Sequence, residues 1–157
     1  YHVRHEIPEQ VFVASMLVDS GMVVLNNLLG ERYAQLVASA PDDDYLPEVE
    51  TATLGVNHLE VGRELAEKWK FPLELINTIA YHHDPFKEGQ LLRDAGLVMA
   101  ARRSVKARGQ GLAISDVLAE FPQEMTGVFQ LDENSLEESV NRGCQDVNEA
   151  KRMLSND

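Results

Sequence analysis

The sequence is poor in the features that mark specialised classes of protein. It has one cysteine, Cys144, in 157 residues, which excludes an internal disulfide framework and favours a reducing cytoplasmic location. We find no convincing alternating strand and expect no apolar run long enough to span a bilayer, so membrane association is not expected. Hydrophobic residues (44%) and charged residues (25%) occur at the levels of an ordinary soluble domain, and the length suffices for a core.

Basic residues are also scarce. Lysine and arginine number 14 against 26 aspartates and glutamates, and a net charge of −12 argues against direct nucleic-acid binding. Residues 102–108, RRSVKAR, form the one basic cluster. It has two interpretations: a helix end whose cations complement the helix dipole, or a patch for an acidic partner or phosphate, formed by Arg102, Arg103 and Lys106.

Proline, glycine and Asp/Asn clusters divide the chain into helices, which predicts a compact, all-α, multi-helix domain. Asn57 with Glu60, and Ser135 with Glu138, are expected helix caps. The predicted helices span residues 8–29 (disturbed at Gly21), 31–40, 47–54, 58–70, 72–84, 91–108, 115–120 and 135–154.

The segment 57–85, NHLEVGRELAEKWKFPLELINTIAYHHDP, places histidines at matched heights on two helices. His58 lies near the start of the first helix, and His82 and His83 lie near the end of the second, with Pro72 opening the second. If the two helices form an antiparallel hairpin, the imidazoles converge at its open end. The alternative is a pair of ordinary packed histidines near a helix C-terminus.

Asp19 interrupts an otherwise apolar helical face that contains Phe12, Met16 and Val23. A buried carboxylate needs a cation, a metal or several hydrogen-bond donors, so Asp19 is a candidate third ligand beside His58 and His82. Alternatively, Asp19 caps the turn that follows it. His2 and His5 are expected to lie in an irregular terminal segment.

These residues resemble the HDOD domains of the HD superfamily of metal-dependent phosphohydrolases. The matching segments are VFVASMLVDSGMVVL (11–25), GVNHLEVGRELAEKW and the following proline (55–72), INTIAYHHDP (76–85) and GLVMAAR (96–102). The resemblance covers residues 8–110 as the later part of such a domain, followed by C-terminal helices over 111–157. We expect one helical domain over 1–157, with a further region upstream of Tyr1.

The sequence departs from the HD pattern where metal ligands stand in the superfamily. The histidine of the His-Asp doublet is replaced by Val18, a following lysine by Met22, and the last aspartate falls near Ala101. The resemblance therefore implies a weak or vestigial metal site formed by Asp19, His58, His82 and His83. No resident cofactor is expected, and any that binds should be a divalent Fe, Mn or Zn ion.

The resemblance implies a bacterial signal-transduction domain that acts by protein or ligand binding and is not an enzyme. Its partners would include a receiver or nucleotide-signalling domain, and a homodimer is an open possibility. The alternative is a metal-dependent phosphohydrolase for a nucleotide or cyclic dinucleotide. A third reading is a helical dimerisation domain whose histidines only pack.

Overall fold

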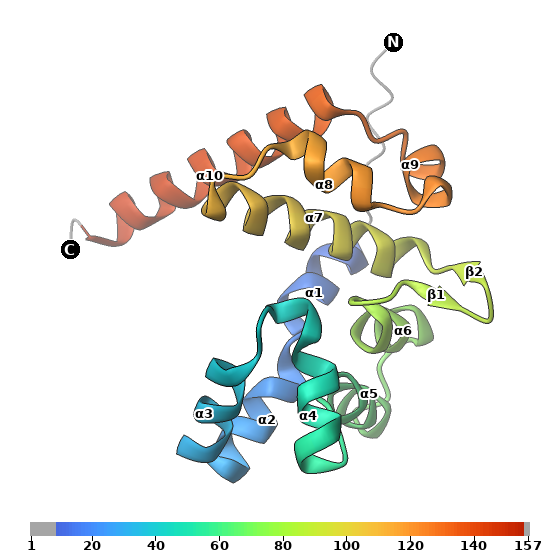
Figure 1. Ribbon diagram of the computed structural model, residues 1–157, viewed down its shortest axis with the longest axis vertical. Helices are drawn as coiled ribbons and strands as arrows, with labels where there is room; N and C mark the ends of the chain where they lie inside the picture. Colours follow the sequence, from blue (N-terminus) through green and yellow to red (C-terminus); the bar gives the residue numbers. More distant parts are fainter. Residues whose placement is uncertain (1–8, 156–157) are drawn as a thin grey trace. The chain divides into compact units, whose positions relative to one another are not determined.

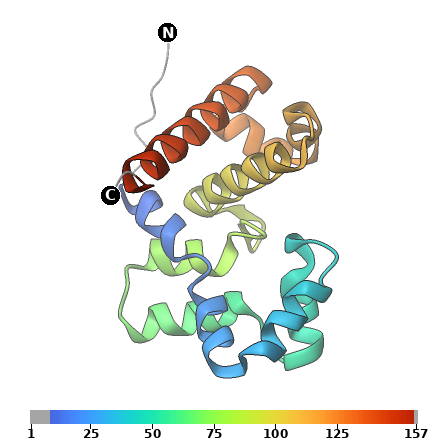
Figure 2. The same cartoon turned by 90° about the vertical axis from the view of Figure 1, so that its left-hand side faces the viewer.

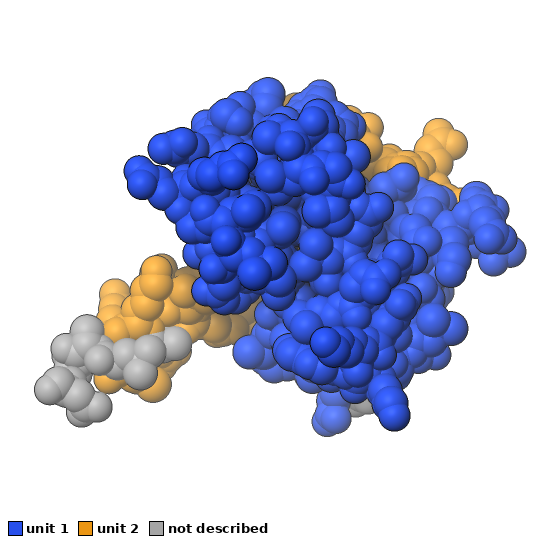
Figure 3. Space-filling model, turned by 90° about the horizontal axis from the view of Figure 1, so that it is seen from below, with its two compact units in different colours: residues 1–98 blue, residues 99–157 orange. Residues whose placement is uncertain are grey.

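The computed structural model describes residues 9–155, so Pro8, His2 and His5, with the expectations attached to them, lie outside the described residues. The chain divides into two compact units, residues 1–98 and 99–157 (Figure 3). The boundary falls inside helix α7 (Arg93–Gln110). Each unit is described separately below, and the single-domain organisation stays a prediction.

The first unit begins with two apolar helices, α1 (Glu9–Leu17) and α2 (Ser20–Leu29) (Figure 1). A turn at residues 18 and 19 separates them, so the expected disturbance at Gly21 was misplaced. Val18 is buried with Val11 and Val98, and the turn places Asp19 directly before α2. The break therefore directs a valine into the core and a carboxylate toward solvent.

The apolar face predicted around Asp19 is not the buried face of α1 and α2. Phe12, Met16 and Val23 are 66%, 73% and 61% exposed, and α1 instead buries Val11 and Ala14. The interpretation of Asp19 as a buried carboxylate is therefore wrong, because its side chain is about half exposed.

Helices α3 (Glu31–Ser39) and α4 (Leu46–Leu54) follow, joined by an acidic loop with a short 3-10 turn, η1 (Asp43–Tyr45). The Asp42 side chain accepts a hydrogen bond from the Asp44 amide and so begins this turn. Leu25, Tyr33, Leu36 and Leu46 form a buried cluster that packs α2, α3 and α4 together. This packing fixes the acidic loop at one edge of the unit.

Helices α5 (His58–Lys68) and α6 (Leu73–Tyr81) form the predicted hairpin (Figure 2). Asn57 and Glu60 make a complete capping box at the start of α5, as expected. At its end Lys70 takes a left-handed conformation, the Lys70 amide bonds to the Glu67 carbonyl and the Phe71 amide to the Ala66 carbonyl. This pattern is a Schellman motif, which satisfies the last carbonyls and turns the chain toward Pro72.

Gly21 and Gly62 bring α2 and α5 unusually close. A Cβ atom on Gly21 would lie 1.9 Å from the His58 carbonyl oxygen and 2.8 Å from the Gly62 amide nitrogen. A Cβ atom on Gly62 would lie 2.9 Å from the Ile79 side chain. The absence of side chains at both positions therefore sets the distance at which the helix that carries His58 packs.

A two-residue hairpin follows α6. Strands β1 (Phe86–Lys87) and β2 (Gln90–Leu91) pair antiparallel around Glu88 and Gly89, both with positive φ. Helix α6 ends at Tyr81 and not at the predicted Asp84, so His82 and His83 follow the helix instead of belonging to it. Asp84, which precedes Pro85, was the predicted last residue of this helix, and the helix ends three residues before it.

The second unit consists of the later part of α7, α8 (Ile114–Glu120), α9 (Gln123–Phe129) and α10 (Glu133–Ser155). The sequence did not predict α9. Asp132 and Ser135 cap α10 reciprocally, three residues before the expected cap at Ser135 and Glu138. The buried apolar residues in the described part of this unit are Met99, Ala100, Ala107, Ile114, Val117, Phe121, Met125, Leu136 and Val140.

The structure confirms the all-α fold class, with one small β-hairpin in the described part of the chain. One stretch of the described residues, Glu9–Leu29, is long and apolar enough to cross a membrane by length and composition, contrary to the sequence expectation. It is weak evidence of a span, because it is divided by the turn at residues 18 and 19 and because core helices pass the same test.

Candidate functional site

Three histidines of the first unit lie side by side. The ring centroids of His58 and His82 are 5.9 Å apart, those of His58 and His83 are 5.2 Å apart, and those of His82 and His83 are 4.6 Å apart. Each ring offers one nitrogen, and these three nitrogens lie within 4.8 Å of one another. His58 and His82 are fully buried and the His83 side chain is 7% exposed, so the histidine cluster (His58, His82 and His83) has limited contact with water.

His58 is held by a buried glutamate that the sequence analysis did not single out. The Glu50 Oε2 atom lies 2.6 Å from His58 Nδ1 and also accepts the His58 backbone amide at 2.8 Å. The Tyr33 hydroxyl donates a hydrogen bond to Glu50 Oε1. Tyr33 comes from α3, Glu50 from α4 and His58 from α5, so three helices meet in one chain of hydrogen bonds.

The Glu50 carboxyl is ionised in this setting. Burial raises its pKa, but hydrogen bonds from the His58 ring, the Tyr33 hydroxyl and the His58 amide outweigh that effect and hold the pKa below its usual value. Burial and the Glu50 carboxylate raise the pKa of Tyr33, which keeps its hydroxyl a donor. Since a carboxylate only accepts, the His58 Nδ1 atom carries the proton toward Glu50.

The other ring nitrogen of His58 has no such support. His58 Nε2 is buried and has no hydrogen-bond partner in the described part of the chain. Because Nδ1 holds the ring proton, a neutral His58 presents the lone pair of Nε2 to the cluster.

His82 has its tautomer fixed in a comparable way. Its Nδ1 atom lies 2.9 Å from the carbonyl oxygen of Ile79 one turn earlier, and a carbonyl can only accept, so Nδ1 is the donor. The Nε2 atom of a neutral His82 therefore also carries a lone pair. Metal-binding histidines commonly donate their second nitrogen to a carboxylate or a backbone carbonyl, and His58 and His82 show one pattern each.

Two carboxylates approach the cluster from the more exposed side. Asp19 Oδ1 lies 3.5 Å from His82 Nε2, and Asp44 Oδ1 lies 3.9 Å from His83 Nδ1. Their side chains are 51% and 38% exposed, in contrast to the buried rings they face. The structure thus brings together all four residues of the expected metal site, Asp19, His58, His82 and His83, and adds Asp44; their role as ligands stays a prediction.

The expected anion patch lies in the second unit, on α7. Arg102, Arg103 and Lys106 are half-buried and each already interacts with other groups, so they do not form an open cationic surface. Their role in binding an acidic partner stays a prediction.

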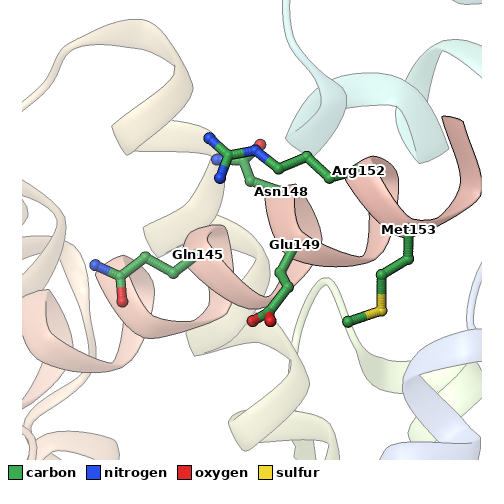
Figure 4. Close-up of a pocket in the computed structure, with 5 residues that line it drawn as sticks. All are labelled: Gln145, Asn148, Glu149, Arg152 and Met153. Carbon is green, nitrogen blue, oxygen red and sulfur yellow. The ribbon is translucent and has the colours of Figure 1, made fainter. Parts of the chain in front are cut away.

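The second unit also has a surface hollow along α10 (Figure 4). Every residue that lines it comes from this single helix, and the lining has no convergent set of titratable groups from different elements. The hollow is therefore a shallow depression between side chains of one helix and not a binding cavity. The lining residues are Gln145, Asn148, Glu149, Arg152 and Met153.

Comparison with known proteins places the first unit in a family. The HDOD domain matches residues 1–85, more than half of the chain. The chain belongs to the HDOD family. An uncharacterized protein of Treponema pallidum (strain Nichols) is 31% identical to this HDOD protein over 74 residues, which cover 46% of the chain and 14% of that relative. The chain thus spans a small part of the relative's length, and no solved structure matches it.

All the cluster residues of this HDOD protein lie within the matched region, as do the three residues that sequence reasoning missed. Glu50 lies in a short helix where a glutamate normally faces water, and Tyr33 is one aromatic residue in an amphipathic helix. Asp44 belongs to a loop that was read only as a turn. The one available signal was the placement of Glu50 eight residues before His58, and spacing of that kind across a glycine break does not predict contact.

The arrangement provides imidazole nitrogens in a dry environment beside carboxylate oxygens. Such a donor set suits a divalent transition-metal ion, because imidazole and carboxylate both bind Zn, Fe and Mn. It also suits a polar core whose histidines are held by hydrogen bonds.

Proposed function

We propose that this HDOD protein is a cytoplasmic regulatory domain of bacterial signal transduction that acts by binding and does not catalyse hydrolysis. The observation that carries the proposal is the environment of Val18. This residue stands where the resemblance places the histidine of the His-Asp doublet, and it is buried in an apolar cluster with Val11 and Val98. The position is used for packing and offers no donor atom.

A hydrolytic centre of the HD type uses metal ions to generate hydroxide and to stabilise phosphoryl charge. Val18 cannot ligate, and the Asp19 carboxylate that follows it lies 3.5 Å from His82 Nε2. The histidine cluster and its carboxylates therefore favour a ligand-responsive site whose occupancy alters the packing of α2, α5 and α6. A receiver or nucleotide-signalling domain is the partner that the family resemblance suggests.

The test combines an activity assay with signalling in the cell. The protein, purified without nickel resin and supplied with Fe²⁺, Mn²⁺ or Zn²⁺, is expected to hydrolyse neither bis(p-nitrophenyl) phosphate nor cyclic dinucleotides. Chromosomal His58→Gln and His82→Gln variants are expected to fold and to lose the signalling output. Unchanged signalling in both variants would support a domain whose histidines only pack.

A second function has one specific observation in its favour, the three histidine nitrogens within 4.8 Å of one another. In this alternative the protein is a metal-dependent phosphohydrolase of a nucleotide or cyclic dinucleotide, with Asp19, His58 and His82 as ligands. Metal-dependent turnover that His82→Ala abolishes would establish it and would contradict the regulatory proposal.

A further inference from the structure

The acidic loop between α3 and α4 brings a carboxylate to the histidine cluster. We propose that Asp44 is a metal ligand of this protein, and that it works with His58, His82, His83 and Asp19 to bind one divalent transition-metal ion. The inference rests on the proposed function, in which this site binds a ligand without hydrolysing it, and it names the ligand and an additional donor.

The separations of the carboxylates from the rings suit a shared ion. In a tetrahedral zinc site with bonds of about 2.0–2.2 Å, neighbouring donor atoms lie roughly 3.3–3.6 Å apart. Asp19 and His82 are separated by 3.5 Å, and Asp44 and His83 by 3.9 Å, which is beyond hydrogen-bond distance. The two carboxylate side chains are 51% and 38% exposed, and each faces a different ring of the cluster.

The buried nitrogen of His58 is the second, independent observation. His58 Nε2 has no hydrogen-bond partner in the described part of the chain, and leaving a buried polar atom unpaired costs about 1–3 kcal/mol. A cation at the centre of the cluster removes that cost, because the lone pair of Nε2 becomes a ligand bond. Glu50 holds the ring in the tautomer that this bond requires.

Protonated histidines paired with Asp19 and Asp44 explain the geometry less completely. Such a state would neutralise the two carboxylates without a metal. It would, however, leave His58 Nε2 either as a buried lone pair or as a buried N–H group, in both cases without a partner. The metal ion accounts for the carboxylates and for His58 together.

Asp44 is distinguished from its neighbours by position and not by charge. Asp42, Asp43 and Asp44 are consecutive carboxylates, but Asp42 caps the 3-10 turn and Asp44 faces His83. Asp43→Asn removes the same charge from the same loop and is therefore the matched control for Asp44→Asn.

The experiment measures metal affinity of the whole chain. Protein purified without nickel resin is stripped with EDTA and titrated with Zn²⁺ and Mn²⁺ in competition with a chromophoric chelator, and thermal unfolding is recorded with and without metal. We expect about one ion per chain and a raised Tm. Asp44→Asn should weaken binding at least about tenfold, and Asp43→Asn should change it less than about twofold.

Two outcomes would overturn the inference. One is the absence of saturable binding by either ion, and the other is equal affinity of Asp44→Asn and Asp43→Asn. Circular dichroism of each variant checks the fold, which the exposure of Asp44 should preserve. Hydrolysis by the metal-loaded protein would instead contradict the regulatory function while leaving the role of Asp44 intact, so the two failures are distinguishable.

Discussion

The two units of the chain bury different kinds of residue. The first unit buries Glu50, His58, Thr78 and His82 together with its apolar core, whereas Ser104 is the one buried polar residue recorded in the described part of the second unit. Burying charged and polar groups is unfavourable unless they are satisfied by specific partners. The comparison shows that most of the buried polar residues lie in the first unit, which contains the HDOD match, and that two of them are histidines of the cluster.

The units also differ in how tightly their glycines are packed. Gly21 and Gly62 of the first unit leave no space for a Cβ atom, whereas Gly127 and Gly143 of the second unit face open space. The same substitution should therefore have opposite effects in the two units.

The largest loss is expected for Glu50→Ala, which removes the partner of His58 and leaves its ring and amide unsatisfied. Leaving a buried donor without its acceptor costs about 1–3 kcal/mol per group, so the summed loss is expected to reach about 3–5 kcal/mol. Urea unfolding should show a loss of that size for Glu50→Ala and a smaller loss for Glu50→Gln, which keeps an acceptor. A loss below about 1 kcal/mol for Glu50→Ala would show that the pair does not stabilise the first unit.

Gly21→Ala should cost about 2–3 kcal/mol, because the new methyl group overlaps the carbonyl of His58 and helix α5 must move. The free energy of unfolding from denaturant titration measures the effect. A neutral result would mean that α2 and α5 separate without cost, and it would remove the proposed reason for the glycine.

Asn57→Ala should cost about 1 kcal/mol through loss of the capping box at the start of α5. The change lies beside His58 but leaves its contacts with Glu50 in place, so metal affinity should change much less than stability. Comparison of Tm with the metal titration separates these two effects, and Asn57→Ser, which keeps a capping oxygen, should retain most of the stability.

Gly143→Ala should stabilise the second unit by about 0.5–1 kcal/mol. Gly143 lies within α10 with open space around it, and alanine has the higher helix propensity. Thermal unfolding would record the gain, and any clear loss would show that α10 is covered at this position by a contact that the residue needs.

The smallest effect concerns the pH dependence of α10. Hydrogen bonds from Ser135 hold the pKa of Asp132 below its usual value. A lowered pKa in the folded state means that the cap stabilises the helix above the ordinary aspartate pKa of about 3.9 and loses this effect as the pH falls below it. The Ser135 amide signal in NMR, followed from pH 6 to pH 2.5, should report this loss, and Asp132→Asn should remove it.

Local signals in the sequence predicted much of the first unit. Helix starts depend on residues close by in the sequence, here the capping residues Asn57 and Glu60 and the proline at position 72. These residues therefore predicted the hairpin and with it the convergence of His58 and His82. The break lies at residues 18 and 19, whereas the low helix propensity of glycine placed the prediction at Gly21. Its actual role depends on α5, which lies about forty residues further along the chain.

The site residues that the sequence did not predict were missed for a common physical reason. Glu50, Tyr33 and Asp44 acquire their importance from neighbours on other helices, and none of them departs from the ordinary pattern of its own segment. Asp132 was not predicted as the cap because Ser135 fits a capping box with Glu138 equally well. The structure shows instead that Ser135 and Asp132 exchange hydrogen bonds between side chain and backbone amide. Helix periodicity identifies faces, but it does not identify which polar residue on a face becomes buried.

The contact of Gly21 with His58 has a consequence for how this protein tolerates sequence change. Any side chain at position 21 would collide with the backbone carbonyl of His58. Glycine at position 21 is therefore required for the packing that positions the His58 imidazole. In a saturation scan, positions 21 and 58 should therefore appear as one coupled unit, in which enlarging the first residue abolishes whatever the second one does even where the histidine itself is retained.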